Sequence, residues 1–105
     1  MKKLTISCFI CMMFAGCHSA KRLEKYGNHY QKHNDYKSLS KVVKALKLDS
    51  DTLYVKKILG EPIDMGFDYR YLVDSTGPTG CPIGAVFHIN AYGKIDQKWI
   101  DEICE

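Results

Sequence analysis

The sequence predicts an α+β domain, in which two short helices pack on a three-stranded antiparallel β-meander in the order ααβββ. Three observations support this fold class. Apolar residues recur at helical spacing over residues 36–47 and again over 52–59. From residue 67 onward, apolar and polar residues alternate instead, which is typical of strands with one buried face. An amphipathic helix has to bury its apolar stripe, and a sheet is its natural partner.

The first predicted helix spans residues 36–47, and Asn34 or Asp35 can cap its start. Its lysines fall largely on the face opposite the apolar stripe. The stripe consists of Tyr36, Leu39, Val42, Val43 and Leu46.

The second predicted helix spans residues 52–59 and has clear boundaries. Asp51 can cap its start, because a carboxylate accepts hydrogen bonds from the free amides of the first turn. Gly60 suits the left-handed residue that ends a helix, and Pro62 prevents the helix from resuming.

Three strands are predicted after residue 66. The first covers residues 67–74 and the second 85–90, and the stretch 75–82 between them is a loop rich in Gly and Pro. Residues 90–94 suit a three-residue hairpin loop, with Asn90 at the first turn position and Gly93 at the left-handed one. The third strand follows this loop, although a helix over residues 96–104 is an alternative interpretation.

The hairpin loop also predicts the register of the last two strands. It places Ile89 opposite Ile95 and Ala85 opposite Trp99. In this register the apolar side chains of both strands share one face, as cross-strand packing requires.

Residues 1–16 have the layout of a secretory signal. Lys2 and Lys3 supply the positive charge at its start, and residues 4–16 carry no charge. This uncharged run of 13 residues is too short to cross a bilayer, whose core needs about 20 residues in a helix. It is therefore predicted to be an export signal and not a permanent span.

The apolar run ends in Phe14, Ala15, Gly16 and Cys17, and two small residues directly before a cysteine resemble the lipobox of bacterial lipoproteins. The resemblance implies that Cys17 is lipidated and becomes the first residue after cleavage, although Phe14 stands where leucine is usual. Several acyl chains make such an anchor effectively permanent, since each buried CH₂ contributes about 0.8 kcal/mol. His18 follows in place of the aspartate that retains some lipoproteins at the inner membrane, which implies the outer membrane. Residues 19–22 lack the acidic run that directs surface display in some bacteria, which implies the periplasmic face.

The five cysteines sort by position. Cys8 and Cys11 lie in the predicted signal, and Cys17 is the predicted lipid acceptor. Cys81 and Cys104 remain as a pair in an exported, oxidising compartment, where a disulfide is the default interpretation. The hairpin register supports this pairing, because it brings Cys81 to within one residue of Cys104.

Charge is divided unevenly along the chain. Residues 18–47 carry eight Lys or Arg against two acidic side chains, a net charge of +6, whereas residues 48–105 carry five basic and ten acidic ones, a net charge of −5. A basic stretch beside a lipid anchor suits a negatively charged membrane surface. A solvated tether followed by a soluble helix face explains the charge equally well. Nucleic acid is not an expected partner of an exported lipoprotein.

Residues 17–35 are predicted to be the lipid anchor and a flexible basic tether, and residues 36–105 the folded domain. Gly27 and Asn28 argue against a stable helix in the tether, beyond one turn around residues 20–26. His29 and His33 are four residues apart, a spacing that can bind a metal ion on a helix. Since no stable helix is expected here, we predict two solvated histidines in a linker.

A second resemblance lies within the predicted domain. It rests on a capped short helix with a valine, followed by Leu-Gly-x-Pro, which is similar to the SmpA/OmlA (BamE) family of small lipoproteins. The resemblance covers about residues 45–95, and it implies the ααβββ fold and a role in outer-membrane β-barrel assembly. The paired cysteines and the loop 77–82 depart from the family pattern. The matching residues are Asp51, Val55, Leu59, Gly60 and Pro62.

No catalytic site is evident in the sequence. A Ser-His-Asp arrangement of Ser75, His88 and Asp74 has no spacing that distinguishes it from chance. No metal site, phosphate-binding loop or small-molecule site is evident either, and no cofactor is expected apart from the lipid on Cys17.

We therefore expect a non-enzymatic protein-binding module, anchored to the membrane, that serves outer-membrane β-barrel assembly or envelope maintenance through an envelope protein partner. The alternative is a small periplasmic inhibitor or immunity-like protein that binds a hydrolase. The candidate contact residues lie on the exposed sheet face and in the loops, and they are Asp68, Arg70 and Tyr92.

Overall fold

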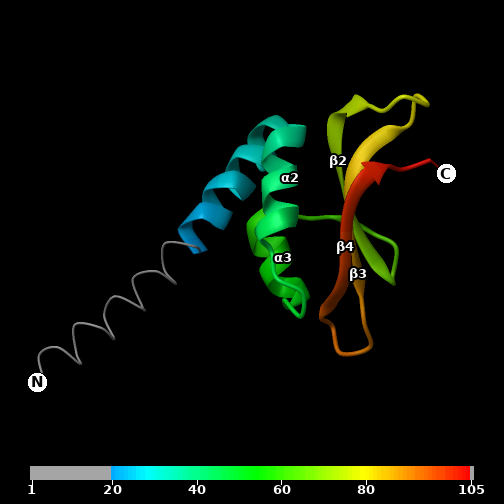
Figure 1. The fold of residues 1–105 in the computed structure, drawn as a ribbon. Helices are drawn as coiled ribbons and strands as arrows, with labels where there is room; N and C mark the ends of the chain where they lie inside the picture. The colour runs from blue at the N-terminus through cyan, green and yellow to red at the C-terminus, as the bar shows by residue number, and fades with distance from the viewer. Residues whose placement is uncertain (1–19, 105) are drawn as a thin grey trace, which may run out of the picture.

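An antiparallel sheet with helices on one of its faces forms the domain in the computed structural model, which describes residues 20–104 (Figure 1). The predicted signal sequence, Cys17 and Glu105 lie outside the described residues. Residues 20–33 form a helix, called here the N-terminal helix. The remaining elements are α2 (Tyr36–Ala45), α3 (Thr52–Leu59), β1 (Ile63–Asp64), β2 (Asp68–Thr76), β3 (Pro82–Ile89) and β4 (Ile95–Glu102).

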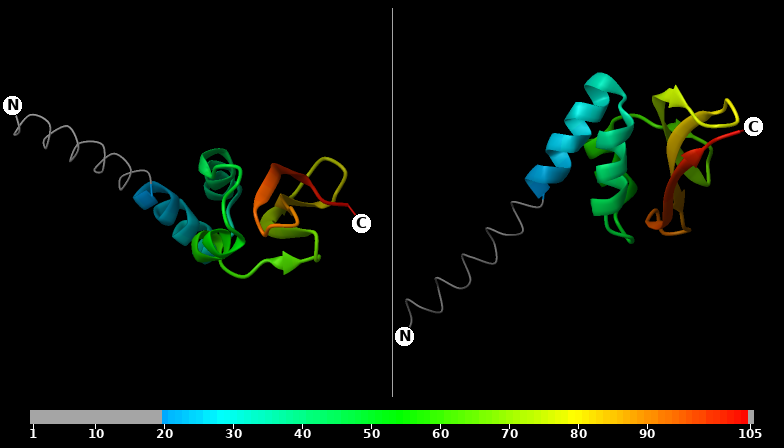
Figure 2. Two further views of the ribbon diagram at one scale, coloured as in Figure 1. Left: turned by 90° about the horizontal axis from the view of Figure 1, so that it is seen from below. Right: turned by 45° about the horizontal axis from the view of Figure 1, so that its top comes forward.

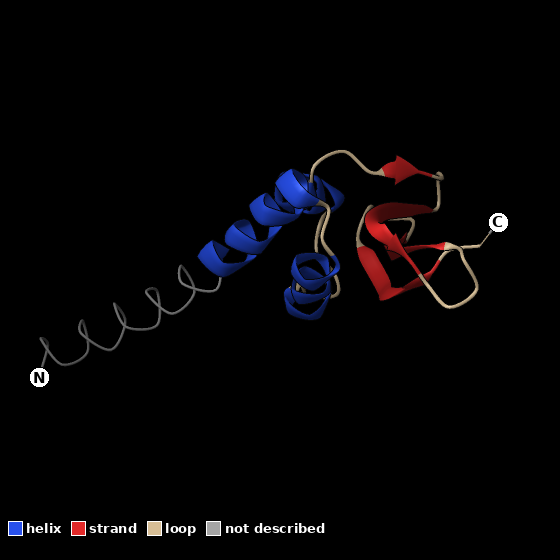
Figure 3. Cartoon of the chain, turned by 90° about the horizontal axis from the view of Figure 1, so that it is seen from above, coloured by secondary structure: helices blue, strands red, loops and turns tan. Residues whose placement is uncertain are grey.

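The strands follow one another in the order β1-β2-β3-β4, and each pair of neighbours is antiparallel. The predicted α+β class and β-meander are thus confirmed. Two elements were not predicted, namely the N-terminal helix and the two-residue strand β1, which pairs with Tyr69 and Arg70. Views from below and from above show the helices as a separate layer beside the sheet (Figures 2 and 3).

Both predicted helix caps are present. The Asp35 side chain accepts a hydrogen bond from Ser38 N at 3.0 Å, and the Asp51 side chain accepts one from Leu53 N at 2.9 Å. These bonds satisfy amides that have no partner within the helix. Gly60 ends α3 with a φ of 86°, a conformation that favours glycine.

The core lies between the helices and the facing side of the sheet. Buried side chains of α2 and α3 meet Tyr71 and Phe87, whose rings lie 5.9 Å apart in an edge-to-face arrangement. The largest fully buried side chains are Phe87, Leu39, Leu46, Ile58, Ile95, Val42 and Val55.

The prediction of a flexible tether is wrong for residues 20–33. This segment is helical, and its Leu23 and Tyr30 belong to the buried core. The Tyr30 hydroxyl donates a 2.5 Å hydrogen bond to the backbone oxygen of Leu72 on β2. Burial, with the charge of Asp74 as a smaller cause, raises the pKa of Tyr30 to about 12. The segment is therefore part of the folded domain.

Gly27, which argues against a helix in the sequence, allows two helices to approach closely in the structure. It is buried where the N-terminal helix crosses α3, and a Cβ at this position would overlap the Ile58 carbonyl oxygen. Gln31, one turn further on, donates a 3.0 Å hydrogen bond to the same oxygen. Only a residue without a side chain permits this contact.

The histidines predicted to be solvated in a linker lie on this helix as well. The His29 and His33 rings are 4.5 Å apart. His29 Nδ1 lies 2.9 Å from Asp35 Oδ1 and 2.8 Å from Ser38 Oγ. His29 therefore links the N-terminal helix to the cap of α2, which the linker interpretation did not anticipate.

The last hairpin confirms one predicted residue pair and contradicts another. Ile89 faces Ile95 as expected, but a β-bulge follows, so that Ala85 faces Ile100 and not Trp99. The bulge inserts one extra residue into β4 and turns Trp99 to the face of the sheet away from the helices. The alternative of a helix over residues 96–104 is wrong, since β4 spans most of this segment.

Lys98, on β4, connects the sheet to the end of α2. Its ammonium group donates hydrogen bonds to the backbone oxygens of Leu46 at 2.5 Å and Lys44 at 3.2 Å, and also to that of Val43. These carbonyls lie at the C-terminus of the helix, where cations are favourable. Burial lowers the pKa of Lys98.

Candidate protein-binding face

The face of the sheet away from the helices, called here the outer face, carries the predicted contact residues of β2. Arg70 pairs with Val86, and Val86 pairs with Trp99, so these three side chains form a row across three strands. Asp68 and His88 belong to the neighbouring row. Trp99 is 44% exposed, which is unusual for so large an apolar residue.

A groove of about 510 Å³ runs along this face. Ile63 and Met65 of the β1 segment line one side of it, and they are 49% and 39% exposed. Arg70 supplies the only charge among the lining residues. The rest of the lining is apolar and consists of Leu72, Pro82 and Ile103.

Asp68 and Arg70 form an ion pair at this groove, with 3.3 Å between Asp68 Oδ1 and Arg70 Nε. Asp68 is only 4% exposed, so the prediction of an exposed contact residue is wrong for Asp68. The pair is shielded from water, and a buried charge of this kind needs its partner. Asp68 therefore positions the Arg70 side chain.

Tyr92, the third predicted contact residue, lies in the turn between β3 and β4 and not on the sheet face. Its side chain is 87% exposed. Asn90 Oδ1 holds the turn by accepting hydrogen bonds from the backbone amides of Tyr92 and Lys94, at 2.9 and 3.1 Å. Gly93 has a φ of 72°, as the predicted hairpin loop requires.

The predicted disulfide is present and holds one wall of the groove. The Cα atoms of Cys81 and Cys104 are 5.3 Å apart. Both cysteines are next to groove residues, since Pro82 follows Cys81 and Ile103 precedes Cys104. Ile103 N also donates a 2.7 Å hydrogen bond to Pro82 O. The disulfide thereby ties the end of the chain to the start of β3.

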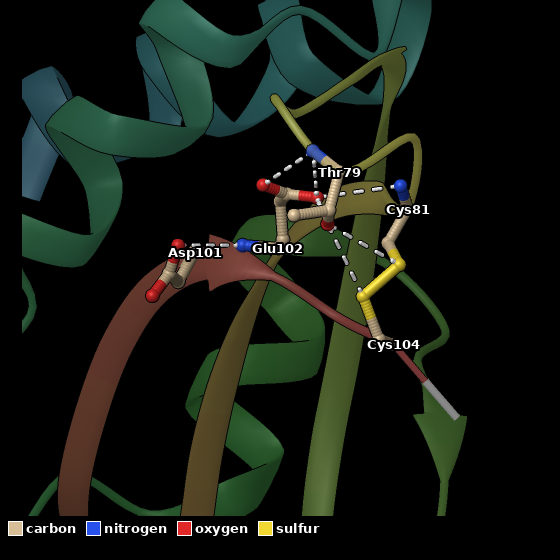
Figure 4. Close-up of a disulfide and its surroundings, with 5 residues drawn as sticks. All are labelled: Thr79, Cys81, Asp101, Glu102 and Cys104. Carbon is tan, nitrogen blue, oxygen red and sulfur yellow. Dashed lines mark hydrogen bonds between the residues drawn. A yellow bond between two sulfur atoms is a disulfide. The ribbon is translucent and has the colours of Figure 1, made fainter.

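Glu102 organises the loop beside this disulfide, a role that no sequence motif indicated. Its carboxylate accepts hydrogen bonds from the backbone amides of Thr79 and Cys81 at 3.2–3.3 Å, and one from the Thr79 hydroxyl (Figure 4). Gly77 packs so closely on the Glu102 side chain that a Cβ there would overlap it. The loop is thus built around one carboxylate.

One cluster of potential metal ligands exists among residues 20–104, and it consists of Cys81, Cys104 and Glu102. Metal ions bind thiolates, and the two sulfurs are joined in a disulfide. In this form the cluster does not fit a metal ion.

The catalytic arrangement considered from the sequence is not formed. His88 Nδ1 lies 2.6 Å from Asp96 Oδ1 on the adjacent strand, and His88 pairs with Asp68 at the start of β2. Ser75 lies seven positions beyond Asp68 along β2, which is about 23 Å at the rise of a strand. Ser75 and His88 therefore cannot act together.

The chain was compared with known proteins, and no family model, curated protein or solved structure matches it. Within the described residues, no helix has the length and apolar character needed to cross a membrane.

Proposed function

We propose that this chain is a membrane-anchored bacterial lipoprotein whose domain is a non-enzymatic protein-binding module in outer-membrane β-barrel assembly or envelope maintenance. The proposal combines a lipidated Cys17, at the periplasmic face of the outer membrane, with a partner bound on the outer face of the sheet. Its resemblance to the SmpA/OmlA (BamE) family rests on the capped helix and the Leu-Gly-x-Pro sequence.

The single observation that carries the binding role is the apolar groove with exposed side chains on its rim. Exposed apolar area of this kind is costly in water unless a partner covers it. Ile63 and Met65 lie on one side of the groove, and Trp99 lies in the same strand row as Ile63 and Arg70. Protein interfaces are enriched in Trp, Met and Arg, and Trp and Arg are frequent among the few residues that provide most of the binding energy.

The groove is also rigid enough to act as a preformed site. The disulfide fixes the wall at Pro82 and Ile103, and the Asp68 carboxylate holds Arg70. Preformed sites bind with a smaller loss of conformational entropy.

The decisive experiment is photocrosslinking in cells from single positions of the lipidated protein. A photoreactive residue at Met65 should capture one envelope protein. The same residue at Leu53, an equally apolar side chain that is 73% exposed on α3, should capture little, since it lies on the helical side.

The identity of the captured partner distinguishes the two functions that the sequence analysis left open. A β-barrel protein or a barrel-assembly component supports the proposal. A soluble hydrolase in a one-to-one complex would instead establish the inhibitor alternative. Equal capture from Met65 and Leu53 would show that the groove is not the binding site.

A further inference from the structure

A second surface lies between the N-terminal helix and α2, far from the groove of the outer face. The two helices are joined by Asn34 and Asp35 and run in opposite directions (Figure 1). A groove of about 500 Å³ lies between them, at the end away from this connection. Its floor is apolar and includes Leu23, Tyr26 and Ala45.

The rim of this groove is entirely cationic. Arg22 lines it from the N-terminal helix, and Lys41, Lys44 and Lys47 line it from α2 and the residues just after it. None of the lining residues is acidic. Lys41 Nζ lies 4.7 Å from the centre of the Tyr26 ring, which keeps this ammonium group over the groove.

The nearest acidic side chain on the N-terminal helix does not neutralise the rim. Glu24 faces away from it, towards α3, where its carboxylate lies 3.8 Å from Lys57 Nζ. The fold therefore brings four of the eight basic side chains of residues 18–47 together in one groove.

The position of this groove relative to the proposed anchor points to its occupant. Arg22 follows Cys17 by five residues, and a fully extended chain spans at most about 3.6 Å per residue. The backbone of Arg22 therefore stays within roughly 18 Å of the backbone of Cys17, which would keep the groove close to the lipid surface. Lys44 and Lys47 line the same groove as Arg22. An anchor this close allows the groove cations to come within about 8 Å of the lipid headgroups, the Debye length over which an anionic surface attracts basic residues.

We propose that this groove docks on the phosphate headgroups of an anionic lipid surface, with the four cations over the phosphates and the apolar floor facing the headgroup region. The inference rests on the anchoring part of the proposed function. Docking would fix the orientation of the domain and leave the outer face, on the far side of the sheet, turned away from the lipid.

The test uses unlipidated protein from residue 17 onward with Cys17→Ser, which retains every described residue. Sedimentation with vesicles of phosphatidylcholine containing roughly one-third phosphatidylserine measures lipid binding apart from the anchor. We expect binding to these vesicles, none to pure phosphatidylcholine, and loss of binding near 1 M salt, where the Debye length falls to about 3 Å.

Two double variants with the same change in net charge distinguish binding through the groove cations from binding that depends only on net charge. Lys44→Glu with Lys47→Glu reverses two groove cations, whereas Lys32→Glu with Lys57→Glu reverses two cations outside it. One basic residue near an anionic surface increases binding by roughly fivefold. The groove variant should therefore bind at least about tenfold more weakly, and the control variant should bind almost as the parent does.

Equal losses of vesicle binding in both variants would show that net charge alone drives binding. That result would overturn the proposal that the groove is the lipid-binding site. Absence of binding by the parent protein would overturn the proposal as well. Neither result bears on the anchor, because the vesicle experiment omits the acyl chains. Circular dichroism of both variants is the control for folding, and both should give the spectrum of the parent.

Discussion

Gly27 has a low helix propensity, yet it stabilises the packing of two helices in the fold. In the middle of a helix, glycine costs about 1 kcal/mol relative to alanine, and on this basis it indicated a flexible segment. In the structure, its missing side chain makes room for the Ile58 carbonyl of α3. The local cost is offset by the packing of two helices.

Gly27→Ala should therefore destabilise the protein, by about 1–3 kcal/mol, even though alanine is the better helix former. The added methyl group would meet backbone atoms, and these cannot move aside without separating the helices. Denaturant unfolding measures the change. Asn28→Ala, at the exposed neighbouring position, is the control and should be neutral or slightly stabilising. A gain in stability from Gly27→Ala would mean that the helices do not touch here.

Asp35 makes the stability depend on pH. Burial raises the pKa of this carboxyl, but hydrogen bonds from Ser38 and His29 outweigh that effect and lower the pKa from 3.8 to about 2. Because the folded pKa is the lower one, Asp35 stabilises the fold above about pH 4, and this contribution is lost as the pH falls towards 2.

Asp35→Asn keeps a good helix cap but removes the titration. Between about pH 5 and pH 2, the parent should lose about 1 kcal/mol more of its free energy of unfolding than the variant does. This magnitude allows for the partial exposure of the side chain. Urea unfolding at several pH values measures both. Parallel pH profiles for the two proteins would exclude a role for this carboxyl.

Among the elements, β4 departs most from the expectation drawn from the sequence. Turn chemistry correctly predicted the hairpin and the pair of Ile89 with Ile95. The bulge after this pair was not predictable, because either register places apolar residues on the core side. It lets Ile95 and Ile100 face the core together and turns Trp99 outward. The outer face gains its tryptophan only through this bulge.

The disulfide at the end of the β3–β4 hairpin should contribute roughly 3 kcal/mol in the chain-entropy model for a loop of about 24 residues. Cys104→Ser should therefore lower the melting temperature by more than about 10 °C in a domain of this size. A reductant should reproduce this change in the parent and leave the variant unaffected. If calorimetry shows equal melting temperatures, the bridge has no structural role.

In the whole molecule, two surfaces of different chemistry lie on opposite layers. The helical layer carries the cationic groove, and the sheet carries the apolar groove around Arg70. Such an arrangement suits a module held between a membrane and a protein partner. An anchored domain also gains from a high local concentration, so that weak contacts suffice.

The anchor itself is tested by Cys17→Ser in cells. Without acyl chains the protein should move from the membrane fraction to the soluble fraction of the envelope, because contacts of the basic groove alone are reversible and sensitive to salt. Immunoblotting of fractions washed at high salt measures this distribution. Retention of the variant in washed membranes would refute lipid anchoring through Cys17.

The sequence by itself was sufficient for the elements whose signals are local. Asp35 and Asp51 as caps, Gly60 and Gly93 at positive φ, and the alternation in β2 depend on near neighbours in the chain. The pairing of Cys81 with Cys104 could also be predicted from the sequence. In the expected oxidising compartment, these were the only two cysteines not assigned to the signal or to the lipid anchor. These local signals were therefore sufficient to predict the α+β class.

Only the tertiary structure decided the features that depend on contacts between distant residues. Gly27 meets Ile58 of α3, and Lys98 of β4 binds the end of α2. The burial of Asp68 likewise depends on its tertiary environment, which no local pattern specifies. The same holds for both grooves, whose walls come from different elements. The helix with a central glycine forms here because its tertiary packing outweighs the low helix propensity of glycine. Those packing contacts exist only in the folded chain.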